Sequence, residues 1–240
     1  MPDPAGSPRT SFVIPVYNEE PILHAAVVDL RERLAPLGWS YEVILAENGS
    51  TDATVRIAQA LSARYPEVRL LSVDEPNYGK ALRRGILRAR GELVICEEID
   101  LCDVDFHVRA VDLLERDVAE LVIGSKLLVD AADERPFLRH AASQLYSGLL
   151  RVLLGFEGTD THGLKAFRRT ALIDLVRACV VDRDVFASEL VIRAYRAHRR
   201  VIEIPVRVVE KRPPSIDLVR RVPGVIANLI QLRRAIRREE

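Results

Sequence analysis

The first half of the chain alternates between short apolar segments and segments with helical periodicity. Strands are predicted at Ser11–Val16, Tyr41–Ala46, Val68–Val73 and Glu92–Cys96. Helices are predicted between them, at about Glu20–Leu37, Thr54–Tyr65 and Asn77–Arg90. Because strands that alternate with helices of this length form right-handed βαβ units, the pattern predicts an α/β fold with a mostly parallel central sheet flanked by helices. Ligands of such sheets bind at the carboxyl ends of the strands.

The second half is less regular. Further strands are predicted at Leu121–Lys126, Gly163–Phe167 and Val201–Val208, and further helices at Leu138–Phe156, Thr170–Cys179 and Ser188–Ala197. After Pro213, arginines interleave with apolar residues at helical spacing. We expect a flexible N-terminal tail at residues 1–9, a single domain at 10–212 and an amphipathic helical tail at 213–240.

Composition narrows the functional class. Apolar residues make up 48% of the chain and the formal net charge is zero, so the chain is globular and no excess of positive charge favours nucleic acid. The cysteines, Cys96, Cys102 and Cys179, fall in no metal-ligand or redox spacing, which indicates reduced thiols. There is no apolar signal segment at the start, and no run of the roughly 20 apolar residues that span a bilayer. We expect a cytoplasmic protein, soluble or peripheral on the cytosolic face of a membrane.

Carboxylates follow the predicted strands. Glu19 comes just past the first strand, and Glu47 and Asp52 enclose the turn at Gly49 after the second, where Ser50-Thr51 would cap the next helix. A carboxylate at a strand end can accept hydrogen bonds from a nucleobase or a ribose. The structural alternative is an ordinary strand-to-helix turn, in which the acid favours the helix N-terminus.

The densest group of acids is the segment Glu97–Asp103. Its carboxylates repel one another, so the group costs stability unless a cation neutralises it. Glu98 and Asp100 are separated by one residue and could share a divalent metal with a diphosphate. A solvated acidic loop is the alternative interpretation.

An ordered set of motifs runs along the chain: Pro15–Glu19, Asn48–Asp52, Asn77–Ala81 with Gly85 and Ala89–Gly91, and Glu98–Leu101. This set resembles the family 2 glycosyltransferases. Later segments are similar to the polyprenyl-phosphate branch of that family, the dolichol-phosphate mannose and glucose synthases: Gly124–Lys126, Asp160–Arg168, Glu189-Leu190 and Ile202–Val206. The resemblance covers about residues 10 to 235.

The resemblance implies a GT-A fold, a nucleoside-diphosphate sugar donor of the GDP-mannose or UDP-glucose type, a divalent metal (Mg²⁺ or Mn²⁺) and inverting transfer to polyprenyl phosphate at a membrane surface. It places these residues at the nucleotide-sugar: Pro15, Tyr17, Glu19, Glu47, Gly49, Asp52, Asn77, Gly79, Lys80 and Glu98. Glu98 and Asp100 would hold the metal. Lys126, Lys165 and Arg168 would hold the acceptor phosphate, and Asp100, Lys126 and Arg168 would be catalytic.

The chain also departs from the family pattern. Glu98 replaces the first acid of the usual Asp-x-Asp, Cys102 replaces the polar residue that follows, Glu47-Asn48 replaces an Asp-Asp, and the segment Asp160–Gly163 is one residue short. Three alternatives stay open: a soluble acceptor, a non-catalytic nucleotide-sugar-binding protein, and a nucleotidyltransferase, whose usual Gly-rich loop the chain lacks.

Two features allow both a structural and a functional interpretation. His162 could be a catalytic base, although a phosphate acceptor that is already ionised has less need of one. The apolar segment Leu145–Phe156 and the Arg-rich tail could be core helices or surfaces lying in a membrane interface.

Overall fold

The computed structural model describes residues 7–73, 75–128, 137–182, 185–207 and 228–236. Within these ranges one sheet is formed by β1 (Thr10–Val16), β2 (Tyr41–Glu47), β3 (Val68–Ser72), β4 (Leu93–Cys96), β5 (Leu121–Ser125), β6 (Lys165–Arg168) and β7 (Val201–Pro205). Its strand order is β3-β2-β1-β4-β6-β5-β7. Neighbours pair in parallel except at β6, which runs antiparallel to β4 and β5. The predicted α/β fold with a mostly parallel sheet is confirmed.

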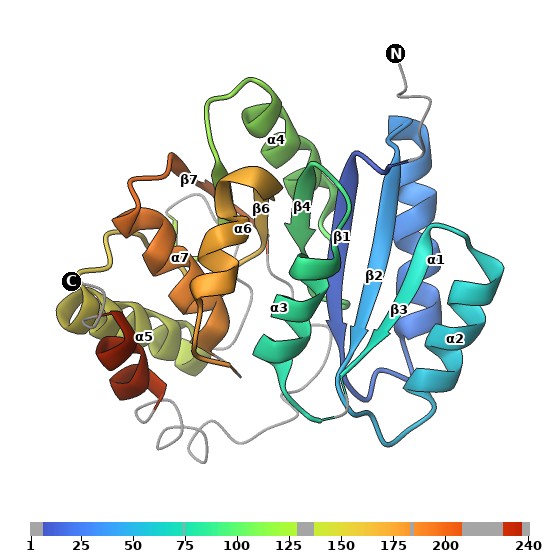
Figure 1. Cartoon of the computed structure of the whole chain (residues 1–240), viewed down its shortest axis with the longest axis horizontal. Coiled ribbons are helices and arrows are strands. Elements are labelled where there is room, and N and C mark those ends of the chain that lie inside the picture. The colour runs from blue at the N-terminus through green and yellow to red at the C-terminus, as the bar shows by residue number, and fades with distance from the viewer. Residues whose placement is uncertain (1–6, 74, 129–136, 183–184, 208–227, 237–240) are drawn as a thin grey trace.

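Helices cover both faces of the sheet (Figure 1). One face carries α1 (Leu23–Leu34), α2 (Thr54–Arg64) and α4 (Val104–Glu115). The other carries α3 (Tyr78–Arg88), α5 (Phe137–Leu154), α6 (Arg169–Ala178), α7 (Phe186–Arg196) and a helix at 228–236. Along β1, Phe12 and Ile14 join the first layer and Val13 joins the second, because successive side chains of a strand point to opposite faces. Burial on both faces explains why the strands are near-continuous apolar runs.

Element boundaries differ from the sequence expectation at a few ends. The first helix begins at Leu23, because the carbonyl of Glu19 accepts hydrogen bonds from the amides of Ile22 and Leu23 in a turn. It ends in a short 3-10 helix, Ala35–Leu37, which contains Pro36. Of the expected tails, residues 1–6, 213–227 and 237–240 lie outside the described residues, as do residues 208–212 at the end of the expected domain; residues 228–236 form a helix.

Two further findings bear on the site. The cysteines at 96, 102 and 179 are buried, and none of them forms a disulfide. Among the described helices, none has the length and apolarity needed to cross a membrane.

Candidate functional site

The loops after β1, β2 and β4 lie together at the carboxyl edge of the sheet, because β1 lies between β2 and β4 and all are parallel. The loops after β1 and β2 are joined by hydrogen bonds. The amide of Asn18 donates to Ser50 Oγ (3.1 Å), the amide of Thr51 to Asn18 Oδ1 (2.8 Å), and the amide of Glu19 to Thr54 Oγ1 (2.7 Å). These bonds place Glu19 and the turn after β2 side by side, as the strand-end argument predicts.

The predicted helix cap at Ser50-Thr51 is wrong. The N-cap of α2 is Ala53, and Ser50 bonds the neighbouring loop instead. The carboxylate of Asp52 instead accepts hydrogen bonds near the start of the helix. Its Oδ1 accepts from the amide of Thr54 (2.9 Å) and its Oδ2 from that of Glu20 (3.2 Å). Burial would raise the pKa of Asp52, but these hydrogen bonds outweigh it and lower the pKa, so the carboxyl is ionised at neutral pH.

Glu47 is buried at the end of β2 and holds its own turn. Its carboxylate accepts from the amide of Ser50 (2.5 Å) and from the hydroxyl of Ser72 (2.7 Å). The turn needs Gly49, whose φ is +79° and where an added Cβ would lie 3.0 Å from the backbone of Glu75. Of the other predicted donor-binding residues here, Pro15 is buried within β1 and Tyr17 is 43% exposed just beyond it.

The N-terminus of α3 contributes Tyr78 to the site, a residue that was not among those predicted from the sequence. Asn77 caps the helix, its Oδ1 accepting from the amide of Lys80 (3.0 Å), while the side chain of Lys80 pairs with Glu75. The hydroxyl of Tyr78 donates to Glu98 Oε1 (2.6 Å) and so joins α3 to the loop after β4. Tyr78 lies inside the Asn77–Ala81 motif, which was the available signal; Gly79, the next residue, is buried.

Glu98 and Asp100 lie in the loop after β4. Burial raises the pKa of Glu98 to about 7; the charge of Asp100 adds to this, while the Tyr78 hydroxyl and the charge of Lys165 oppose it. Two carboxylates in one loop supply the hard oxygen ligands that Mg²⁺ or Mn²⁺ takes when substrate phosphates complete its coordination, so the residues fit such an ion. In the described part of the chain, no group of three or more His, Cys, Asp or Glu side chains is arranged to hold a metal.

The acidic segment is less concentrated than the sequence predicts. Glu97 is buried on the other side of the strand end, paired with the buried His107 of α4. Asp103 is the N-cap of α4, accepting from the amide of Phe106 (3.2 Å). The acids of this segment therefore do not all face one site, because Glu97 and Asp103 have structural partners of their own. Repulsion among them persists at Glu98, whose pKa is raised by burial and further by the charges of Asp100 and Glu97.

A basic group faces this region from the second half of the chain. Lys126, just past β5, pairs with Asp160 (Nζ to Oδ2, 3.2 Å), and both side chains are nearly buried. Burial would raise the pKa of Asp160, but Lys126 and the amide of His162 outweigh it and lower the pKa. Asp160 is a second residue that the sequence argument did not assign, although it opens the Asp160–Arg168 motif.

Lys165 connects the acidic and basic groups. It is 3% exposed and donates to the carbonyl of Gly163 (2.7 Å). Burial lowers its pKa, against the influence of Cys96, Asp160 and Glu98. Its charge thus acts on Glu98 and on Asp160. The resemblance implies direct contact between Lys165 and an acceptor phosphate, whereas the burial of the side chain makes it a counter-ion behind the site.

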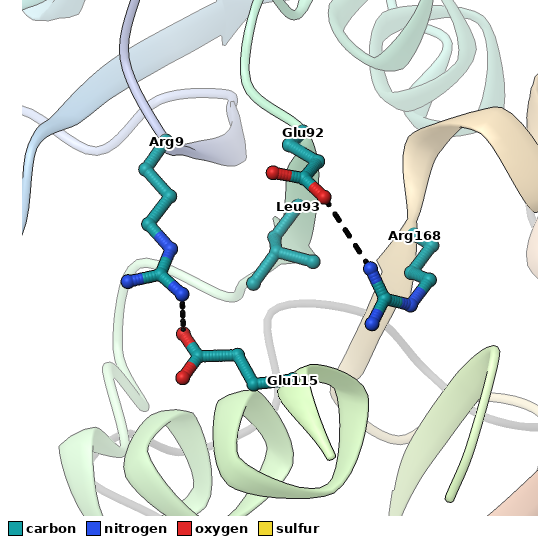
Figure 2. Close-up of a pocket in the computed structure, with 5 residues that line it drawn as sticks. All are labelled: Arg9, Glu92, Leu93, Glu115 and Arg168. Atoms are coloured by element: carbon teal, nitrogen blue, oxygen red, sulfur yellow. Dashed lines mark hydrogen bonds and ion pairs between the residues drawn. The ribbon is translucent and has the colours of Figure 1, made fainter. Parts of the chain in front are cut away.

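Arg168 does not lie at this edge, so its predicted place beside the acceptor phosphate is wrong. Because β6 is antiparallel, Lys165 pairs with Cys96 at the end of β4 and Arg168 with Leu93 at its start, roughly 10 Å away along the strand. Figure 2 shows Arg168 paired with Glu92 (3.3 Å) in a hollow that Arg9 and Glu115 complete. The charges of this hollow are matched in pairs.

The side chain of His162 is exposed on the same loop as Asp160, with its ring against that of Tyr146 of α5 (centroids 4.9 Å apart). The contact links α5 to the site.

Comparison with known proteins agrees with this architecture. Residues 11–176 match the family described as "Glycosyl transferase family 2". Similar proteins are Glycosyltransferase AglD of Haloferax volcanii (33% identity; 95% of this chain, 37% of the relative), the Undecaprenyl-phosphate 4-deoxy-4-formamido-L-arabinose transferase of Edwardsiella ictaluri (30%; 84% and 60%) and the Dolichyl-phosphate beta-glucosyltransferase of Drosophila melanogaster (31%; 83% and 67%). The chain thus spans less than two thirds of the length of the Haloferax and Edwardsiella relatives.

Among solved structures, glucosyl-3-phosphoglycerate synthase from Mycobacterium tuberculosis, in complex with Mn²⁺, UDP and phosphoglyceric acid, superposes with a TM-score of 0.67 at 22% identity, covering 94% of this chain and 78% of that one. At this identity the likeness shows the shared GT-A fold. The family match covers most of the chain and includes the loops after β1, β2 and β4. The chain therefore belongs to glycosyl transferase family 2.

Proposed function

We propose that the chain transfers a hexose from a nucleoside-diphosphate sugar to polyprenyl phosphate, with inversion at the anomeric carbon. The observation that carries the proposal is the juxtaposition of acids and a basic group at one edge of the sheet. Lys165 pairs with Cys96 at the end of β4, just before the loop of Glu98 and Asp100, and Lys126 lies just past the end of β5 on the other side of β6. Such a site can hold a diphosphate and a second phosphate side by side. Relatives named as transferases of dolichyl and undecaprenyl phosphate support the acceptor class.

In this proposal Glu19 and Asp52 bind the nucleoside, and Glu47 keeps their turn in place. A divalent metal held by Glu98 and Asp100 would stabilise the negative charge of the leaving diphosphate. Lys126 holds the acceptor phosphate, one of whose oxygens attacks the anomeric carbon from the side opposite the diphosphate. The new C–O bond forms as the bond to the diphosphate oxygen breaks. The phosphate oxygen is already ionised at neutral pH, so no protein base has to remove a proton.

The decisive test replaces Asp100 by Asn. Transfer should fall by at least about 100-fold, because the asparagine would hold a divalent metal less well and the charge of the leaving diphosphate would be less stabilised, while circular dichroism stays unchanged. The assay pairs labelled GDP- and UDP-sugars with polyprenyl phosphate, with and without Mg²⁺ or Mn²⁺. Asp105→Asn, an exposed acid in the same region, is the matched control. Full activity of Asp100→Asn, or transfer by the wild type to water-soluble acceptors only, would overturn the proposal.

We also propose that α5 lies against a phospholipid membrane, where a polyprenyl tail resides. Leu145, Leu149 and Val152, which we call the α5 stripe, are 68%, 39% and 83% exposed and follow one another at helical spacing along one side of the helix. The opposite side packs Leu150 and Leu154 into the core. An exposed apolar stripe on the helix that contacts His162 supports an interface next to the acceptor side of the site.

A further inference from the structure

The carboxylate of Glu203, in β7, accepts several hydrogen bonds from the loop that carries Asp160. The amide of Thr159 donates to both of its carboxylate oxygens (2.8 and 3.1 Å), and the hydroxyl of Thr159 donates to Oε2. The hydroxyl of Tyr195 lies 3.4 Å from Oε1. One carboxylate thus fixes both the main chain and the side chain of Thr159.

The hydroxyl of Thr159 makes a second contact, with Ser125 Oγ (2.6 Å), at the last residue of β5. A hydroxyl has a single proton. Because Thr159 gives its proton to Glu203, Ser125 must be the donor in this contact. Ser125 Oγ in turn accepts from the amide of Leu127 (3.2 Å), which fixes the turn after β5.

The residues that follow these two hydroxyls are the two partners of the ion pair described above. Lys126 follows Ser125, and Asp160 follows Thr159. The close approach at Gly158 shows how tightly the loop is seated: a Cβ there would lie 2.4 Å from Glu203 Oε1 and 2.8 Å from the Tyr195 hydroxyl. The carboxylate therefore lies directly behind the segment that presents the ion pair.

We propose that Glu203 is a positioning residue, which acts through Thr159 and Ser125 to hold Lys126 and Asp160 in pairing geometry. We call the hydrogen bonds that join Glu203, Thr159 and Ser125 the clamp. Because the clamp holds the residues directly before Lys126 and Asp160, it sets the direction of the Lys126 ammonium group, and reacting groups tolerate little misplacement. The consequence for catalysis rests on the proposed function, in which Lys126 holds the acceptor phosphate. The clamp itself does not.

Four variants test the clamp. Glu203→Gln removes the charge of the acceptor, and Thr159→Val removes the hydroxyl, each with little change in side-chain size. Thr159→Ser retains the hydroxyl. Glu120→Gln is the matched control, because Glu120 accepts from the amide of Arg200 (3.0 Å) at the opposite end of the same strand pair. We expect kcat/KM for polyprenyl phosphate to fall on the order of tenfold in Glu203→Gln and Thr159→Val, with the donor KM unchanged and the other two variants near wild type.

A second readout needs no activity. The chain has four lysines, at positions 80, 126, 165 and 211, so isotope-labelled lysine gives few signals, each assignable by a single Lys→Arg variant. Glu203→Gln and Thr159→Val should shift or broaden the Lys126 signal and leave that of Lys80 unchanged. An unchanged Lys126 signal in both folded variants would overturn the clamp. If the wild type does not transfer sugar to polyprenyl phosphate, the proposed function fails, and the lysine spectrum still decides the clamp.

Discussion

The carboxyl group of Glu98 lies where burial and the charge of Asp100 both oppose ionisation, and its pKa rises from its ordinary value of 4.5 to about 7. Without metal, the folded protein therefore keeps this proton up to about pH 7, whereas the unfolded chain releases it near 4.5. Since the folded state binds more protons in that window, the free energy of unfolding decreases as pH rises through it.

We predict that Glu98→Gln melts at a higher temperature than the wild type at pH 8 in EDTA, and at the same temperature at pH 4. Each kcal/mol of difference in the free energy of unfolding should change the melting temperature by about 2–4 °C, as measured by calorimetry. The exposed substitution Glu32→Gln is the control. A difference of equal size at both pH values would show that the raised pKa is not the cause.

At the scale of elements, α3 brings Tyr78 to Glu98 only because the helix lies directly on β1. Gly85 permits this, since a Cβ there would be 2.3 Å from Val13 Cγ1. We predict that Gly85→Ala lowers the free energy of unfolding by about 1–3 kcal/mol in urea, because overpacking outweighs the gain in helix propensity. Gly148 of α5 has open space around it, so Gly148→Ala should be neutral or stabilising by up to about 1 kcal/mol. Equal effects at the two glycines would contradict this account of the packing.

At the scale of the whole molecule, α5 lies at the lower left of Figure 1, away from α4 at the top. If the α5 stripe meets a membrane, the double variant Leu145→Ser/Val152→Ser should bind phospholipid vesicles roughly tenfold or more weakly, because it withdraws two apolar side chains from burial. Val108→Ser, an exposed position on α4, serves as the control. Vesicle flotation measures the binding. Equal binding by all three proteins would rule out this surface.

Much of the site could be predicted from the sequence because strand ends in a parallel sheet converge. Glu19, Asp52 and Glu98 each follow a recognisable strand, and the structure places them at one edge. The partners of Glu97 and Asp160 could not be predicted in the same way, since His107 belongs to the following helix and Lys126 to the end of another strand, and both meet these acids only through packing. Adjacent acids also look alike in sequence, yet Glu97 and Glu98 acquire different partners.

The αβα layering and the acidic strand ends can be predicted from the amino-acid sequence alone, because hydrophobic periodicity and turn chemistry are local properties. The positions of the basic residues at the site depend instead on the three-dimensional fold. The reversal of β6 places Lys165 at the site and Arg168 at the far edge, although both belong to one short basic motif. Strand direction depends on which neighbours a strand pairs with, and those neighbours, β4 and β5, are set by long-range packing that no local pattern records.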